Sequence, residues 1–149
     1  MNELNPGVVQ ASCLCGAIGL ELSLPAKWIA HCHCSQCRRA HGAALVTWAG
    51  FGSDQVRFQA GSARPTWYPS SEHARRGFCG QCGSSLLFES TRWPKEIHVA
   101  RAAIKAEMAQ MPGAHVFYDN RVPWLDVDDE LPKISSHAIL SKHGNAHTD

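Results

Sequence analysis

The chain has 149 residues and a mass of 16.3 kDa, and 44% of its residues are hydrophobic, which suits one globular domain. Its 14 Lys and Arg residues nearly balance its 13 Asp and Glu residues. The resulting net charge of +1 argues against a strongly basic DNA-coating protein and against an acidic tail protein. The unusual feature is 7 cysteines, an odd number that would leave one thiol over from a closed set of disulfides.

The beginning of the chain, residues 1–11, has no apolar run with basic flanks, so we expect no targeting segment. No stretch reaches the ~18 apolar residues of a membrane span. We therefore expect a cytoplasmic protein without a membrane partner. Because thiols stay reduced in the cytoplasm, the cysteines are better interpreted as metal ligands or catalytic thiols than as disulfides.

The first expected strand covers residues 18–24, where aliphatic residues alternate with small or polar ones and Pro25 ends the pattern. Residues 35–45 predict a short helix with Ser35 as its N-cap, and residues 104–111 predict another helical turn or two. Glycine and proline separate most of the remaining strand-like runs, at residues 45–49, 56–58, 66–68, 75–78, 86–89, 97–102 and 115–118.

Eight short strands and little helix predict a mainly β fold of several small sheets in a single domain, residues 1–149. We expect the β core to span about residues 8–132. Residues 133–149 are polar, and from residue 135 they lack clear periodicity, so they are expected to form a flexible or peripheral tail. In that tail, His143 and His147 are interpreted as solvated surface.

All the cysteines fall into three tight groups, which are Cys13 and Cys15, then Cys32, Cys34 and Cys37, and finally Cys79 and Cys82. Tetrahedral zinc needs thiolates ~2.3 Å from the metal, and therefore sulfurs gathered around one point. A Cys-x-x-Cys turn achieves this when glycine lets the backbone fold around the ion, and Gly80 and Gly83 are placed for that role. In Cys-x-Cys, residues i and i+2 point to the same side of an extended chain.

The natural partition of the cysteines is four plus three. The two doublets would form a closed four-thiolate site, which is the structural pattern, and would tie residue 13 to residue 82. The triplet would hold a second zinc with one position open, which is the catalytic pattern. The sequence thus predicts two zinc ions per chain.

Two alternatives stay open at this point. Cys79 and Cys82 could form a thioredoxin-type redox pair, although the residues that follow them predict a turn and a strand where a helix would be needed. The triplet could instead hold a second purely structural zinc that is completed by His31, His33 or His41. If that segment is extended, alternation places His31 and His33 on the face opposite Cys32 and Cys34.

In their order and spacing, the cysteine groups resemble those of the glutathione-dependent formaldehyde-activating enzyme family. This family also includes the centromere protein V domain. The resemblance runs from about Val8 to about Pro132. It is carried by the segments Ser12–Ala17, His31–Arg39, Gly77–Ser84, His115–Tyr118 and Pro123–Leu125.

This resemblance implies an Mss4-like, zinc-containing β fold of several small coiled antiparallel sheets. It implies a structural zinc on the four doublet cysteines (Cys13, Cys15, Cys79 and Cys82) and a labile zinc on the triplet (Cys32, Cys34 and Cys37). It also implies a carbon–sulfur lyase resembling S-(hydroxymethyl)glutathione synthase, which joins glutathione to formaldehyde.

The implied chemistry is consistent with the triplet. A thiol adds to an aldehyde as its thiolate, but a free thiol with a pKa near ~8.5 is mostly protonated at neutral pH, whereas a coordinating thiol is deprotonated. Zinc with three cysteines and a substrate thiolate would carry a charge of +2 − 4 = −2, which makes it a poor Lewis acid. We therefore expect zinc to capture and position a small thiol such as glutathione, with polarisation of formaldehyde secondary.

Other residues are less specific candidates. Four arginines, Arg38, Arg39, Arg75 and Arg76, could pair with the glutathione carboxylates, or they could be surface groups and structural ion pairs. Four tryptophans, Trp48, Trp67, Trp93 and Trp124, are interpreted as core or rim packing. His41 could act as a proton shuttle or support the metal loop.

Two other classes of function compete with the enzyme. One is a zinc-stabilised module that binds protein or nucleic acid without catalysis, although the near-neutral charge argues against a nucleic-acid partner. The other is a metal-buffering or redox-sensing protein that uses the labile triplet.

Overall fold

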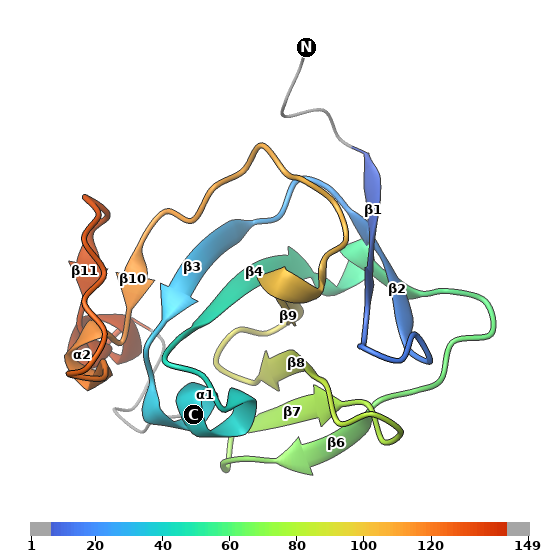
Figure 1. Ribbon diagram of the computed structural model, residues 1–149, viewed down its shortest axis with the longest axis horizontal. Helices are drawn as coiled ribbons and strands as arrows, with labels where there is room; N and C mark the ends of the chain where they lie inside the picture. The colour runs from blue at the N-terminus through green and yellow to red at the C-terminus, as the bar shows by residue number, and fades with distance from the viewer. Residues whose placement is uncertain (1–6, 143–149) are drawn as a thin grey trace.

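The computed structural model describes residues 7–142, which form a mainly β fold with two short α-helices (Figure 1). The strands are β1 (Val8–Ser12), β2 (Gly19–Ser23), β3 (Trp28–Cys32), β4 (Val46–Gly52), β5 (Val56–Phe58), β6 (Thr66–Pro69), β7 (Ala74–Phe78), β8 (Ser85–Ser90), β9 (Glu96–Ala100), β10 (His115–Val116) and β11 (Lys133–Ile134). The α-helices are α1 (Ser35–His41) and α2 (Ser136–Leu140), and short 3₁₀ turns lie at Ser53–Gln55, Arg101–Ala103 and Tyr118–Asn120.

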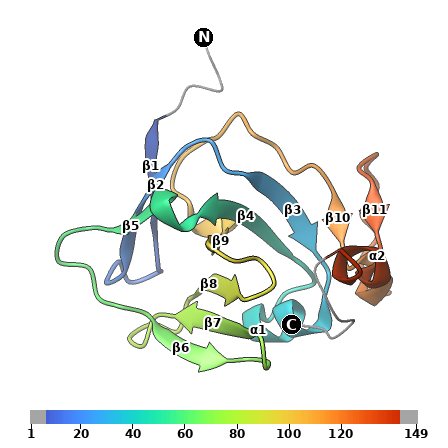
Figure 2. The same cartoon turned by 180° about the vertical axis from the view of Figure 1, so that it is seen from behind.

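The strands form two sheets, which confirms the expected mainly β architecture. A small sheet has the order β1-β2-β5, and the large sheet has the order β11-β10-β3-β4-β9-β8-β7-β6. Pairing is antiparallel except around β10, which runs parallel to both β3 and β11. The segment after β9 crosses over the ends of β3 and β4 to reach β10, as both views show (Figures 1 and 2).

One face of the large sheet forms the main hydrophobic core. Because side chains alternate along a strand, residues paired across strands share a face. A row of paired residues on this face crosses five strands and consists of Ile29, Ala49, Val99, Leu87 and Gly77. The first four of these residues have aliphatic side chains that are buried in one cluster with Leu20 and Leu22 of the small sheet, so the two sheets pack together there.

The opposite face carries a second row, shifted by one residue along each strand. This row consists of Trp28, Gly50, His98, Phe88 and Arg76. A shorter row beside it contains Ala30, Trp48 and Ala100, and the next pair is Cys32 and Val46. The register of the sheet therefore places aromatic side chains, the cationic Arg76 and the thiol of Cys32 on the same face. A second buried cluster forms there.

Gly50 makes room for the indole ring of Trp28. A Cβ atom built at Gly50 would overlap the Trp28 ring. We predict that Gly50→Ala displaces this ring and lowers the free energy of unfolding by about 1–3 kcal/mol, as overpacking typically does. Chemical denaturation measures the change, with Gly113→Ala as the control because its nearest neighbour would lie at an ordinary 4.0 Å. Equal stability of the two variants would contradict the prediction.

The structure corrects three local expectations. Cys34, and not Ser35, caps α1, because its sulfur accepts a hydrogen bond from the Cys37 backbone N–H. Residues 104–111 form no helix; apart from a bridge from Ile104 to Ala11, they form irregular chain. The strands β1 and β3 were not predicted, because neither shows a clean period of two.

Part of the expected tail is packed. Asp119 accepts hydrogen bonds from the backbone N–H and the hydroxyl of Ser136, at 2.7 and 2.6 Å, and so anchors the start of α2. Leu140 at the end of this helix is 3% exposed and belongs to the second cluster. His143 and His147 lie outside the described residues.

The two α-helices have 7 and 5 residues, far fewer than the roughly 20 that span a bilayer.

Candidate metal centres

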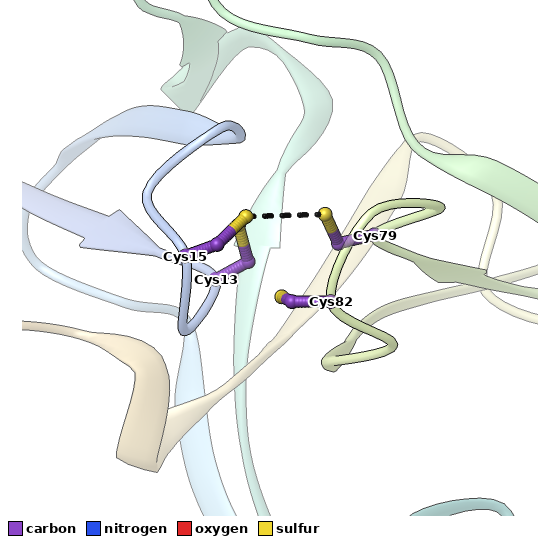
Figure 3. Close-up of side chains that lie close together, drawn as sticks. All are labelled: Cys13, Cys15, Cys79 and Cys82. Atoms are coloured by element: carbon purple, nitrogen blue, oxygen red, sulfur yellow. Dashed lines mark hydrogen bonds between the residues drawn. The ribbon is translucent and has the colours of Figure 1, made fainter.

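Four cysteines from two turns far apart in the sequence converge on one point. Cys13 and Cys15 lie in the turn between β1 and β2, and Cys79 and Cys82 lie in the turn between β7 and β8. Their side chains point toward one another (Figure 3). The Sγ atoms of Cys13 and Cys15 are 3.7 Å apart, and those of Cys15 and Cys79 are 3.8 Å apart. All four sulfurs lie within 4.8 Å of one another.

These separations fit a tetrahedral metal site. A tetrahedron with metal–sulfur bonds of about 2.3 Å has sulfur–sulfur edges of about 3.8 Å, whereas a disulfide would bring the sulfurs to about 2.05 Å. Backbone N–H groups point at the sulfurs, as expected for thiolates. The amide of Ile18 donates to Cys13 Sγ at 3.2 Å, and the amide of Gln81 donates to Cys79 Sγ at 3.4 Å.

The turn at Cys79–Cys82 is shaped for this role. Gly83 has a φ of 82°, a left-handed conformation that favours glycine. The hydroxyl and backbone of Ser84 stabilise the adjacent thiolate and lower the pKa of Cys82 to about 5. The chain then enters β8 and not a helix, which contradicts the thioredoxin-type interpretation of this pair.

The other three cysteines form a second, fully buried cluster. Cys32 ends β3, Cys34 caps α1, and Cys37 lies in the first turn of that helix. The Sγ atoms of Cys32 and Cys37 are 3.6 Å apart, and all three sulfurs lie within 4.8 Å of one another. The structure therefore brings the seven sulfurs together in the groups of four and three that the spacing predicted, and none of them forms a disulfide.

Within this cluster, Cys37 is surrounded by donors. The thiols of Cys32 and Cys34 are the largest influence that holds the pKa of Cys37 well below its ordinary value, and the Arg76 guanidinium and Trp48 indole N–H contribute. Arg76 Nη1 lies 3.5 Å from Cys37 Sγ, and Trp48 Nε1 lies 3.4 Å from it. Hydrogen bonding to Cys34 and Cys37, together with burial, raises the pKa of Cys32 well above its ordinary value.

None of the candidate histidines joins the three cysteines. Within residues 7–142, no histidine or carboxylate belongs to this cluster. His33 Nε2 instead lies 2.8 Å from Nδ1 of the fully buried His115, whose Nε2 lies 2.9 Å from Asp129. His31 bonds to Thr47 at 2.8 Å. Both histidines therefore lie on the face of β3 away from the cysteine sulfurs, as alternation predicted.

His41 contacts an aromatic ring beside the cluster and does not line the cavity at the three cysteines. It packs edge-on against Trp48, with ring centroids 5.2 Å apart, and borders a different hollow from the one beside the three cysteines. This placement argues against His41 as the proton shuttle and favours a supporting role.

A small aromatic cavity of about 70 Å³ lies against the three cysteines. Besides the sulfurs, its lining contains Trp28, Trp48, Phe88, Trp93, Phe117, Arg76 and His98. The sequence analysis missed Trp28, Phe88, Phe117 and His98. The sequence contains a pattern that points to His98. Glu96 and His98 are two positions apart in one strand, so their side chains share a face and can interact. The contribution of Trp28 depends on its folding over Gly50, which only the sheet register reveals.

The other arginines and tryptophans have separate roles. Arg75 forms an ion pair with Glu89 at 2.9 Å and stacks on Trp67, with its guanidinium 3.9 Å from the ring centre. Arg38 donates to the backbone oxygen of His33 at 3.4 Å. Trp124 is 72% exposed, so it is a surface residue.

Glu96 holds His98 in place from outside the cavity. His98 Nε2 donates to Glu96 Oε1 at 3.0 Å, and Lys27 Nζ lies 3.2 Å from the other carboxylate oxygen. The hydrogen bond from His98, reinforced by Lys27, lowers the pKa of Glu96 from 4.5 to about 2. The carboxylate is therefore charged throughout the neutral range.

This low pKa predicts a pH-dependent contribution to stability. A carboxylate whose pKa is lowered on folding stabilises the fold above its unfolded value, and the stabilisation is lost as the pH falls toward its folded value. The stability advantage of the native chain over Glu96→Gln should therefore shrink between about pH 5 and pH 2. Urea unfolding of both proteins across this range measures it. Thiolate ligands also take up protons and release metal as the pH falls, so the comparison is confined to pH values at which both proteins keep their zinc and unfold cooperatively. A constant difference over these values would contradict the prediction.

Comparison with known proteins identifies the class to which these features belong. The profile of the glutathione-dependent formaldehyde-activating enzyme family matches residues 8–120, a range that includes all seven cysteines, and the chain belongs to this family. An uncharacterized lyase of Schizosaccharomyces pombe is 30% identical over 82 residues, which span 55% of this chain and 58% of the relative. A crystal structure of a Rhodobacter sphaeroides protein matches with a TM-score of 0.56 and 26% identity, over 67% of this chain and 91% of that chain.

Proposed function

We propose that this chain is a zinc-dependent carbon–sulfur lyase that joins and separates a small thiol, such as glutathione, and formaldehyde or another small electrophile. The observation that carries the proposal is the three-cysteine cluster, which supplies three ligands, has no fourth among residues 7–142, and opens onto a small cavity. Three protein ligands with an exchangeable fourth position are typical of catalytic zinc. Membership of the family supports the lyase assignment.

Cys32, Cys34 and Cys37 would hold the catalytic zinc, which would supply a position that keeps a substrate thiol deprotonated. The chain's own groups prepare this position. Arg76 and Trp48 donate to Cys37 and offset part of the negative charge that three thiolates gather in a buried place. Without such donors, a charge of this size would disfavour the approach of another anionic sulfur.

The size of the cavity supports a compact electrophile. On this scale of volume, about 10–15 Å³ holds one water molecule, so a cavity of about 70 Å³ has room for a molecule of a few heavy atoms and is small for a tripeptide. The thiol end of glutathione would reach the cluster from outside, while formaldehyde would occupy the aromatic cavity. The aromatic rings would exclude bulk water, which otherwise competes with the thiol for the aldehyde.

The four-cysteine site would hold a second, structural zinc, giving two per chain. Its sulfurs match a closed tetrahedron, and a closed site leaves no position for a substrate. The reduced thiols that both sites need are maintained in the cytoplasm, which is therefore the compartment that we propose.

Exchange spectroscopy by NMR tests the proposed reaction. With glutathione and formaldehyde at equilibrium, the zinc-loaded protein should accelerate the exchange of the methylene group between formaldehyde hydrate and its glutathione adduct. The uncatalysed rate and the rate with a bovine albumin control give the background. An exchange rate no higher than this background would contradict the proposal.

The binding-module alternative receives no support from Arg75 and Arg76. Arg75 is paired with Glu89, and Arg76 is buried beside Cys37, so neither offers a free cation to a phosphate backbone.

A further inference from the structure

His98 occupies a central position on the face of the sheet that carries the three-cysteine cluster. It lies in the row between Gly50 and Phe88, is 5% exposed, and lines the same cavity as the three cysteines. Its ring stacks on Phe88 with centroids 5.4 Å apart, and it packs nearly perpendicular to Trp28 with centroids 4.6 Å apart. These contacts fix the orientation of the imidazole.

One ring nitrogen of His98, Nε2, is committed to a carboxylate. Nε2 donates its proton to Glu96 Oε1 at 3.0 Å, and the same carboxylate also accepts from the indole N–H of Trp28 at 3.4 Å and pairs with Lys27. A carboxylate that accepts from one nitrogen of an imidazole selects the tautomer in which the other nitrogen has a lone pair. Nδ1 is thus the atom of His98 that can take and return a proton.

The proposed reaction needs such an atom. Adding a thiol to a carbonyl moves one proton from sulfur to oxygen, and the reverse reaction moves it back. Among the described residues that line the cavity, the cysteines are the proposed metal ligands, Arg76 has a guanidinium group with no acceptor atom, and the remaining side chains apart from His98 are Trp and Phe rings. His98 is therefore the group in this lining that is suited to general acid–base catalysis.

We propose that His98 carries the proton between the substrate thiol and the carbonyl oxygen, with Glu96 as the positioning residue. This inference rests on the proposed function. In the forward direction, His98 Nδ1 takes the proton that the thiol gives up as it becomes a thiolate, the sulfur attacks the carbonyl carbon, and the carbonyl π electrons move to oxygen. The imidazolium then gives the same proton to that oxygen, which yields the hydroxymethyl thioether. In reverse, the hydroxyl returns its proton to Nδ1 as the carbon–sulfur bond breaks, so no other reactant is consumed.

The test compares exchange rates of three zinc-loaded variants with the native chain. His98→Gln preserves the approximate size of the side chain but cannot carry a proton, so we expect a loss of at least about 100-fold. His98→Ala should lose a similar factor and recover at least about tenfold when imidazole is added, because free imidazole can occupy the vacated space. His137→Gln, at an exposed histidine of α2, should match the native rate.

Two further readouts distinguish proton transfer from a structural role. The zinc content and the glutathione affinity of His98→Gln, the latter measured by calorimetry, should equal those of the native chain. A native exchange rate in His98→Gln, while the native chain is active, would overturn this role and leave the proposed function standing. Loss of activity without imidazole rescue, or with loss of zinc, would overturn it in favour of a structural role. An inactive native chain would overturn both.

Discussion

The Cys79→Ser chain is expected to have no stable fold at room temperature. Cys79 is 1% exposed and lies within the main core, and its site joins the β1–β2 turn to the β7–β8 turn across 64 positions of sequence. A structural zinc contributes on the order of 10 kcal/mol to folding in small zinc peptides, which is comparable to the whole stability of a typical domain, about 5–15 kcal/mol. Near-ultraviolet circular dichroism would report the loss of fixed packing.

Leu14→Ser provides the matched control for this effect. Leu14 lies in the same turn, between two of the ligands, and is 89% exposed, so its replacement should leave both folding and zinc content unchanged. A Cys79→Ser chain that unfolds at the native midpoint, with the native amount of zinc, would show that the four sulfurs do not hold a structural metal.

The second large effect is expected at the other cluster. Cys37→Ser should reduce the catalysed exchange by about 100- to 1000-fold, because it removes both a proposed zinc ligand and the sulfur on which Trp48 and Arg76 converge. Loss of several kcal/mol of metal-assisted stabilisation of the transition state lowers the rate by a factor of this size. The exchange experiment with glutathione and formaldehyde measures the loss.

Cys37→Ser should nonetheless keep its fold, which distinguishes it from Cys79→Ser. The variant should retain one zinc per chain and a cooperative thermal transition, since the four-cysteine site is intact. Ser35→Ala, at a neighbouring position of α1 that is outside the cluster, should keep the native rate. Retention of the full exchange rate in Cys37→Ser would remove the three-cysteine cluster from the mechanism.

The two doublets and the triplet of cysteines could be predicted from sequence because each depends on local spacing, whereas the joining of the two doublets followed from the four ligands of a structural zinc site. Residues separated by one or two positions on a turn or an extended chain must lie close together, whatever the rest of the fold does. The placement of His33 away from the cysteine face likewise followed from alternation along one strand, and the structure agrees.

The cavity could not be predicted in the same way, because it depends on register between strands that are far apart in sequence. Trp28, His98 and Arg76 meet only when β3, β4, β9, β8 and β7 pair with the observed offsets. A shift of one residue in any of these ladders would turn the side chains of that strand to the other face. Similarly, α2 is too short for periodicity to reveal that Leu140 is buried.

The central claim, that one zinc is structural and the other is held by an open three-thiolate site, is tested most directly by timed zinc release to a coloured chelator. Freshly purified protein should release two zinc ions per chain in two phases, one fast and one slow. Cys37→Ser should lack the fast phase, and the fold monitored by circular dichroism should survive that phase in the native chain. Release of a single zinc per chain in one slow phase, with the three-cysteine cluster intact and reduced, would contradict the claim.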